Sequence, residues 1–331
     1  MNQQIQYCTT PDGVRLAYAV IGKGPRMVRT SHWFSHLEHD LTSPIFQPDI
    51  LGLARQHELL RYDARGIGLS QREVDVSFDA FVRDLETVID AAKFDRFVLL
   101  GLSQGCGQAI AYAARHPDKV SHLILYGGYA RGQFHRDDVE KQKEKIELGC
   151  ALIRSGWGSG EESHRQFFTS QFMPDADKEL HHSLNETQRL AAAPEMAERF
   201  LRANAAFDVT GLLPKISAPT LVLHPTGDLR VPFPLGQEMA AGIKGAKFVP
   251  LDTRNHMLAP NEPAHQVMVK AVAEFLGEKP IRITGMSDRL EHKAKALEQH
   301  WFIKFMLVFA AITGCLIFFW EIYKLVRGGA H

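Results

Sequence analysis

The sequence has little cysteine and no excess of charge of either sign. Its four cysteines lie far apart and form no C-x-x-C motif, which argues against a disulfide framework and a zinc site and indicates a reducing compartment. They are Cys8, Cys106, Cys150 and Cys315. Lysine and arginine together number 38, as do aspartate and glutamate, so the charge balance predicts no nucleic-acid partner.

Signals for export and for cofactor binding are also lacking. Residues 1–7 contain neither a basic stretch nor an apolar run, so we expect no secretory signal. The metal-ligating side chains His32, His36, Glu38 and His39 share one short loop without a second ligand cluster, and we expect no metal and no cofactor. The 331 residues, without repeats, suit one large domain with an insertion, or two domains.

One long apolar run lies near the C-terminus. No residue from Phe305 to Trp320 is charged, and as a helix this run would be about 24 Å long. Extending it back to Trp301, with the Lys304 ammonium reaching the headgroups, gives about 30 Å, the thickness of a bilayer's hydrocarbon core. The two tryptophans would then mark the membrane interfaces. We therefore predict a single transmembrane helix over residues 301–323; the alternative is a buried core helix.

The charges that flank this run predict the orientation of the protein in the membrane. The run is preceded by Arg289, Lys293, Lys295 and Lys304, and followed by Lys324 and Arg327. This bias predicts a single-pass C-terminal membrane anchor with the N-terminal domain in the cytoplasm. Residues 278–300 would form a helical connector, and residues 324–331 a short tail.

Strand and helix patterns alternate in the part of the chain before the connector. Strands are predicted at residues 4–9, 14–21, 26–30, 59–62, 97–100, 123–126, 220–224 and 247–251. Helices are predicted at 78–92, at 108–114 with an end near residue 116, and at 263–276. This alternation predicts a mostly parallel central sheet with helices on both faces, formed by residues 1–128 and 219–277. Between them, residues 129–218 have a helical pattern, which predicts a cap over the carboxyl edge of the sheet.

A G-x-S-x-G pentapeptide joins one predicted strand to a helix. Gly101 and Gly105 flank Ser103, an apolar run precedes them and a helical pattern follows. This layout is typical of a nucleophile elbow, in which a sharp turn presents the serine above the sheet. Ser103 is therefore the candidate nucleophile for acyl transfer or hydrolysis.

An acid and a histidine follow Ser103 in the order that such a nucleophile requires. Asp228 comes just after the strand at 220–224, and His256 just after the strand near 247–251. A serine hydroxyl needs a base to take its proton, and the base needs a third group to orient it. We predict that Ser103, Asp228 and His256 form a catalytic triad in the order used by α/β-hydrolases.

The oxyanion of the reaction needs backbone N–H donors. We expect one from Gln104, at the start of the helix after Ser103. The second should come from the loop after the strand at 26–30, where Trp33 is the candidate.

Several segments resemble the α/β-hydrolase superfamily: residues 62–70, 101–105, 227–228 and 255–256. Three others, residues 33–38, 154–158 and 168–175, are similar to bacterial hydrolase domains that are often fused to class III adenylate or guanylate cyclases or to LuxR-type regulators. The resemblance covers about residues 5–277 and implies the α/β-hydrolase fold with a cap and serine-hydrolase activity. Such domains usually have glycine before the oxyanion donor, where this chain has His32.

Large side chains of the cap and of the site loops are candidates for a substrate pocket: His32, Trp157, Phe168, Phe172 and Met257. Together they would line an apolar acyl pocket beneath the cap. The alternative for the cap aromatics is simple packing.

These observations predict a membrane-anchored serine hydrolase that cleaves a small or lipid-like carboxylic ester through an acyl-enzyme. Cleavage of lactones or amides, or perhydrolysis, would use the same residues. The alternative is a catalytically weak, hydrolase-like binding or regulatory subunit tethered to a membrane protein complex. His32 and the small residues Ala310 and Gly314, which suit close helix packing in the membrane, motivate this alternative.

Overall fold

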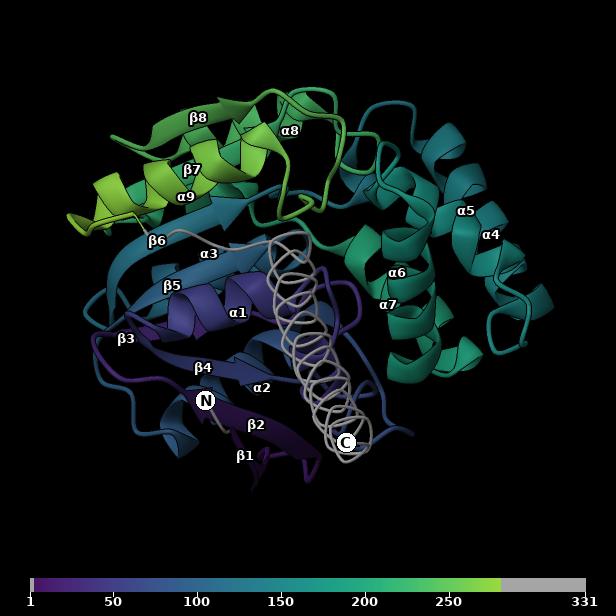
Figure 1. Ribbon diagram of the computed structural model, residues 1–331, viewed down its shortest axis with the longest axis horizontal. Helices are drawn as coiled ribbons and strands as arrows, with labels where there is room; N and C mark the ends of the chain where they lie inside the picture. The colour runs from purple at the N-terminus through teal and green to yellow at the C-terminus, as the bar shows by residue number, and fades with distance from the viewer. Residues whose placement is uncertain (1–2, 281–331) are drawn as a thin grey trace, which may run out of the picture. The chain divides into compact units, whose positions relative to one another are not determined.

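The computed structural model describes residues 3–280, in which a central sheet lies between two layers of helices (Figure 1). The strands are β1 (Gln4–Thr9), β2 (Arg15–Ile21), β3 (Arg26–Arg29), β4 (Glu58–Tyr62), β5 (Phe97–Leu102), β6 (Val120–Tyr126), β7 (Thr220–Pro225) and β8 (Lys247–Leu251). Within the described residues they form one eight-stranded sheet in the order β1-β2-β4-β3-β5-β6-β7-β8. Only the pairings of β2 with β1 and β4 are antiparallel, so the carboxyl ends of the other strands share one edge.

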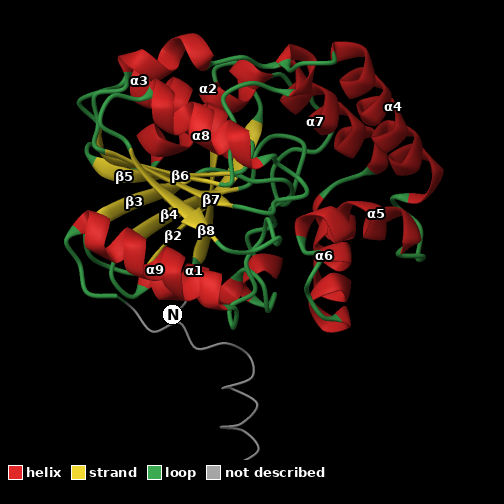
Figure 2. Ribbon diagram, turned by 90° about the horizontal axis from the view of Figure 1, so that it is seen from above, coloured by secondary structure: helices red, strands yellow, loops and turns green. Residues whose placement is uncertain are grey.

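Helices cover both faces of this sheet. Figure 2 shows α2 (Phe78–Ala91), α3 (Gly105–Arg115) and α8 (Phe233–Gly242) on one face, and α1 (Gln47–Ala54) and α9 (Pro263–Leu276) on the other. Helix α2 shows why such segments pack here. The Ser77 side chain caps its N-terminus by accepting a hydrogen bond from Ala80 N–H at 3.2 Å, and its apolar stripe, which includes Phe81 and Leu85, is buried.

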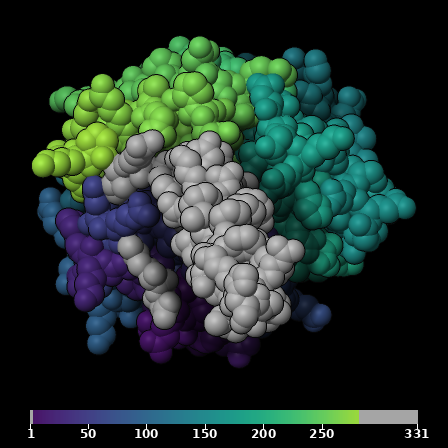
Figure 3. Space-filling model, viewed as in Figure 1, coloured from purple at the N-terminus to yellow at the C-terminus, as the bar shows by residue number. Residues whose placement is uncertain are grey.

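Four helices lie between β6 and β7, in the segment for which the sequence predicts a cap. They are α4 (Val139–Gly156), α5 (Ser163–Phe172), α6 (Lys178–Ala191) and α7 (Pro194–Ala206). Figure 1 shows them gathered at one end of the sheet, and in Figure 3 their teal surface meets the green surface of the segment after β7. The predicted domain boundaries themselves stay predictions.

The predicted strands and core helices are confirmed within a few residues. The largest shift is in β6, which begins at Val120 rather than at residue 123. Helix α8 was not predicted, and neither was helix α1. Its sequence QPDILGLA is only eight residues long and contains Pro48 and Gly52, so it carries no clear helical stripe.

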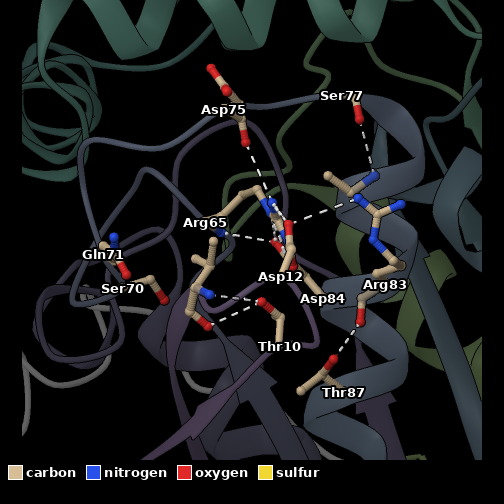
Figure 4. A network of polar contacts seen from close by, with 12 residues as sticks. Thr10, Asp12, Arg65, Ser70, Gln71, Asp75, Ser77, Arg83, Asp84 and Thr87 are labelled. Atoms are coloured by element: carbon tan, nitrogen blue, oxygen red, sulfur yellow. Dashed lines mark hydrogen bonds and ion pairs between the residues drawn. The ribbon is translucent and has the colours of Figure 1, made fainter.

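A buried ion-pair network fixes the loop after β4 to the β1–β2 turn and to α2 (Figure 4). The Arg65 guanidinium donates to Asp84 at 2.8 Å and to Asp12 at 2.7 Å, and Asp84 is fully buried. Because each donor faces a carboxylate, the buried charges compensate one another. Arg65 therefore has a structural role far from the candidate site.

The described residues contain no helix that combines the length and apolar character of a membrane span. The segment predicted to cross the membrane, residues 301–323, lies outside the described residues, as does most of the predicted connector.

Candidate active site

Ser103 lies at a sharp turn between β5 and α3. Its φ angle is 52°, a left-handed conformation that is unusual for a residue with a side chain. The Ser103 N–H donates to the carbonyl of Tyr126 at the end of β6, at 2.9 Å, which holds the turn at the carboxyl edge of the sheet. Gly105 is required because a Cβ there would lie 2.2 Å from Thr30 Oγ1. The G-x-S-x-G segment thus forms the elbow that the sequence predicts.

The structure brings the three predicted side chains together at this edge. Ser103 Oγ lies 3.0 Å from His256 Nε2, and His256 Nδ1 lies 2.7 Å from Asp228 Oδ2. All three residues are buried. The distances are those at which a histidine can take the serine proton while a carboxylate orients the imidazole.

Backbone groups orient Asp228. Its Oδ1 accepts hydrogen bonds from the N–H groups of Arg230 and Val231, both at 2.8 Å, which leaves Oδ2 for His256. Burial alone would raise the pKa of Asp228, but the charge of His256 and the hydrogen bonds from His256 and Val231 outweigh burial and lower it. Asp228 is therefore ionised at neutral pH, as an orienting carboxylate must be.

A tyrosine that the sequence argument missed holds the histidine loop in place. The hydroxyl of Tyr126 donates to the carbonyl of His256 at 2.8 Å. Tyr126 ends β6, next to the elbow, so the same residue contacts both the serine turn and the histidine loop. Its only sequence signal is its place at the carboxyl end of a core strand.

The two predicted oxyanion donors flank Ser103. Among the described residues, no hydrogen-bond acceptor is found for the backbone N–H of Trp33 or of Gln104. Thr30 fixes the Trp33 loop to β5, because its hydroxyl accepts from the N–H of Leu102 at 3.2 Å and its own N–H donates to Leu100 at 2.9 Å. Within the described part of the chain, neither N–H group is therefore engaged in another backbone hydrogen bond.

His32, the residue before the predicted oxyanion donor Trp33, is buried and stacks on Phe46 with the ring centroids 4.8 Å apart. Neither ring nitrogen has a hydrogen-bond partner within residues 3–280. Burial lowers the pKa of His32 well below its ordinary value, and the charges of Arg29, Arg61 and His256 lower it further. The imidazole is therefore neutral at physiological pH.

On the cap side of Ser103, side chains of the described residues pack closely around Trp33. The cavity there has a volume of about 10 Å³, about enough for one water molecule. The predicted pocket residues Trp157, Phe168 and Phe172 are each at most 1 % exposed and pack around Trp33, with ring centroids 6.4, 5.8 and 5.9 Å from it. Of these three, Phe172 also contacts the His256 ring, at 5.6 Å.

On the other side of Ser103 a cavity of about 160 Å³ runs between the sheet and helices α1 and α9. Its wall includes Ser103, His256 and two of the predicted pocket residues, His32 and Met257. Trp157, Phe168 and Phe172 are not part of it. We call this cavity the sheet-side channel. The large space beside the candidate nucleophile therefore lies under the sheet helices and not under the cap.

Within residues 3–280, no group of three or more histidine, cysteine, aspartate or glutamate side chains is placed to hold a metal ion. The chemistry that Ser103, His256 and Asp228 can perform together is acyl transfer by an activated serine.

Comparison with known proteins finds similarity to hydrolases, in agreement with the geometry of the candidate site. A family model described as the alpha/beta hydrolase fold matches residues 41–149. The chain is 27% identical over 262 residues to a pimeloyl-[acyl-carrier protein] methyl ester esterase from Neisseria meningitidis, covering 77% of this chain and 92% of the relative.

Solved structures agree in fold. An enol-lactonase from Burkholderia xenovorans LB400 has a TM-score of 0.68 at 23% identity, covering 82% of this chain and all of the neighbour. An esterase from Exiguobacterium antarcticum has a TM-score of 0.67 at 21% identity, covering 81% and 98%. Together, the family model and these neighbours strongly support the α/β-hydrolase superfamily, and the relatives support a hydrolase.

Proposed function

We propose that this protein of the α/β-hydrolase superfamily is a serine hydrolase that cleaves carboxylic esters through an acyl-enzyme on Ser103. The main support for this proposal is the geometry of the three side chains. Ser103 Oγ lies 3.0 Å from His256 Nε2, and His256 Nδ1 lies 2.7 Å from Asp228 Oδ2. The relatives named as esterases support an ester as the substrate class. The closer resemblance to domains fused to cyclases or LuxR-type regulators stays a prediction.

The proposed reaction has two stages. Ser103 Oγ attacks the ester carbonyl while His256 Nε2 takes its proton, and the N–H groups of Gln104 and Trp33 bind the oxyanion. The ester C–O bond then breaks, and His256 returns the proton to the departing alcohol. In the second stage water, deprotonated by His256, attacks the acyl-enzyme and releases the acid.

Hydrolysis of p-nitrophenyl acetate tests this function. We expect Ser103→Ala to lower kcat/KM by at least about a thousandfold, because no other group replaces the nucleophile. Ser170→Ala, an exposed serine on α5, serves as the matched control and should leave the rate unchanged. Equal rates for wild type and Ser103→Ala would overturn the proposed function.

A binding or regulatory subunit with an idle triad is the second candidate. The observation that favours it is the unpartnered, buried His32 in the loop that supplies an oxyanion donor. Replacing His32 with glycine distinguishes the two functions. A rise in turnover of more than about tenfold would mean that His32 suppresses catalysis, whereas an unchanged or lower rate favours the enzyme as it stands.

We also propose that residues 301–323 anchor the protein in a membrane, with residues 1–277 in the cytoplasm. The length and apolar character of this run and the charges that flank it support the proposal. The run lies outside the described residues, so the support comes from the sequence alone. Extraction of cell membranes with alkaline carbonate tests it: the full chain should stay in the pellet. Release into the supernatant would contradict an anchor, and co-purification with a membrane protein in mild detergent would identify a partner.

A further inference from the structure

The sheet-side channel is built from one face of the sheet. Met27 and Arg29 of β3, Leu100 and Leu102 of β5, and Ile124 and Tyr126 of β6 line it. Members of each pair are two residues apart, so they point to the same face, the one covered by α1 and α9. From α9 the wall includes Val269 and Val272.

This channel has the size of a small ligand site. Its volume of about 160 Å³ is comparable to an engineered apolar cavity of about 150 Å³ that binds benzene. Ser103 and His256 lie in its wall, so a group bonded to Ser103 Oγ can extend directly into it. On the other side of Ser103, the cavity found among the described residues has a volume of about 10 Å³.

Arg29 is a buried cation within this largely aliphatic wall. Only 6 % of the residue is exposed, and no hydrogen bond or ion pair of its guanidinium is found within residues 3–280. Its nitrogens are not among the fully enclosed atoms that lack a partner, so they reach the open space of the channel. Burial lowers its pKa to about 10, which still leaves it charged at neutral pH. A buried charge without a partner is costly, so an unpaired arginine facing a cavity indicates an anionic ligand.

The carboxylates near Arg29 are committed to other bases. Asp49, which also lines the channel, lies 2.7 Å from His265 Nε2, and Asp40 lies 3.3 Å from Arg61. The charges of both carboxylates raise the pKa of Arg29 through space, without a hydrogen bond to its guanidinium. The five N–H groups of its guanidinium thus remain free for a carboxylate, which they can bind through two parallel hydrogen bonds.

Strand register places Arg29 a short distance from Ser103. Arg29 of β3 pairs with Leu100 of β5, and Leu102, the residue before Ser103, lies two positions further along the strand. Ser103 is thus three positions beyond Leu100, which corresponds to roughly 10 Å along the sheet. A short aliphatic chain would span the gap between the serine and the guanidinium.

We propose that the sheet-side channel holds the acyl group of the substrate, and that Arg29 binds a carboxylate at the far end of that group. The substrate class is then a monoester of a short dicarboxylic acid. This inference rests on the proposed function, because it uses Ser103 as the point of attachment. The chemistry of the acyl transfer is unchanged, and Arg29 adds specificity.

Two substrates with the same carbon skeleton test the role of Arg29. Monomethyl adipate and methyl hexanoate differ in whether the far carbon is a carboxylate or a methyl group. We expect the wild type to prefer the adipate ester in kcat/KM by roughly ten- to hundredfold, the range for a hydrogen-bonded charge. Arg29→Leu should abolish this preference by lowering kcat/KM for the adipate ester more than for methyl hexanoate, and Arg29→Lys should restore part of it.

Two matched controls separate the channel from general effects. Arg26→Leu removes a half-exposed arginine at the start of the same strand and should keep the preference. Val272→Phe fills the channel from α9 and should slow both methyl esters, whereas Val267→Phe, at an exposed position of α9, should not. The short substrate p-nitrophenyl acetate should be hydrolysed at the wild-type rate by the two control variants, Arg26→Leu and Val267→Phe.

A binding measurement makes failure of the two proposals distinguishable. Calorimetry with Ser103→Ala should detect adipate binding that Arg29→Leu abolishes, without any turnover. Acetate hydrolysis that depends on Ser103, together with no adipate preference, would overturn the Arg29 site and leave the proposed function intact. Adipate binding that depends on Arg29, without hydrolysis by the wild type, would overturn the proposed function and leave the binding site.

Discussion

The two sides of Ser103 differ in both space and charge. On the cap side, aromatic rings fill the volume, and Arg230 lies over the Trp33 and Phe172 rings at 5.3 and 5.2 Å and donates to Gln171. On the sheet side the volume is about 160 Å³ and Arg29 has no partner within the described residues. Tight packing indicates a structural region even though Arg136 Nη2 on the cap side is buried without a hydrogen-bond partner, whereas open space beside an unpaired charge indicates a place for a ligand.

The largest expected difference is between the effects of an Arg65 and an Arg29 substitution on the free energy of unfolding. Arg65→Met should lower the free energy of unfolding by about 3–5 kcal/mol, because it leaves the Asp84 carboxylate buried without a partner. Arg29→Met should lower the free energy of unfolding much less or not at all, because Arg29 loses only the through-space attraction of Asp40 and Asp49. Denaturant unfolding of the full chain in detergent measures both. Equal losses would mean that Arg29 is a structural residue like Arg65.

A matched pair of phenylalanines compares packing on the two sides. Phe168→Ala should cost about 3–5 kcal/mol of unfolding free energy, because this ring lies inside the cap cluster, 5.5 Å from the Trp157 ring. Phe46 lines the channel, so Phe46→Ala enlarges an existing space and should cost about 2 kcal/mol. The same denaturant titration measures both variants, and a larger loss for Phe46→Ala would contradict an open channel.

A smaller, pH-dependent effect probes the channel wall, where Asp49 of α1 meets His265 of α9 at 2.7 Å. Burial lowers the pKa of His265, but the charge and hydrogen bond of Asp49 and the charge of Glu262 outweigh burial and raise it. A raised folded-state pKa stabilises fully below the unfolded value of about 6.5, and this contribution is lost as pH rises through the folded value. Asp49→Asn should therefore cost about 1 kcal/mol at pH 6 and less at pH 9.

Thermal unfolding of wild type and Asp49→Asn at the two pH values measures this difference. Asp79→Asn, on exposed α2 surface, is the control and should show no pH-dependent gap of this kind. A gap that grows toward pH 9 would contradict the pairing of α1 with α9.

Sequence reasoning located the core and the candidate triad because local signals carry them. The glycines around Ser103 indicate a turn, and Asp228 and His256 follow predicted strands whose carboxyl ends must meet at one edge of a parallel sheet. Chain order and strand direction therefore sufficed, without knowledge of packing.

The sheet-side channel could not be predicted from the sequence, because its existence depends on which helices cover each face of the sheet. Short α1 carries no clear periodic signal, so the wall containing Asp49 was not predicted. Arg29 ends a four-residue strand, and its lack of a partner is visible only when neighbouring elements are placed. Aromatic composition suggested a pocket at Trp157 and Phe168, whereas these side chains pack against one another.

The most direct test is a crystal structure of the protein after reaction with a hexylphosphonate ester that labels activated serines. We predict phosphorus bonded to Ser103 Oγ and the hexyl chain in the sheet-side channel, beside Leu100 and Ile124. A hexyl chain beneath the cap beside Trp33, or a protein without phosphorus at Ser103, would contradict the proposed division between a packed cap side and a binding channel.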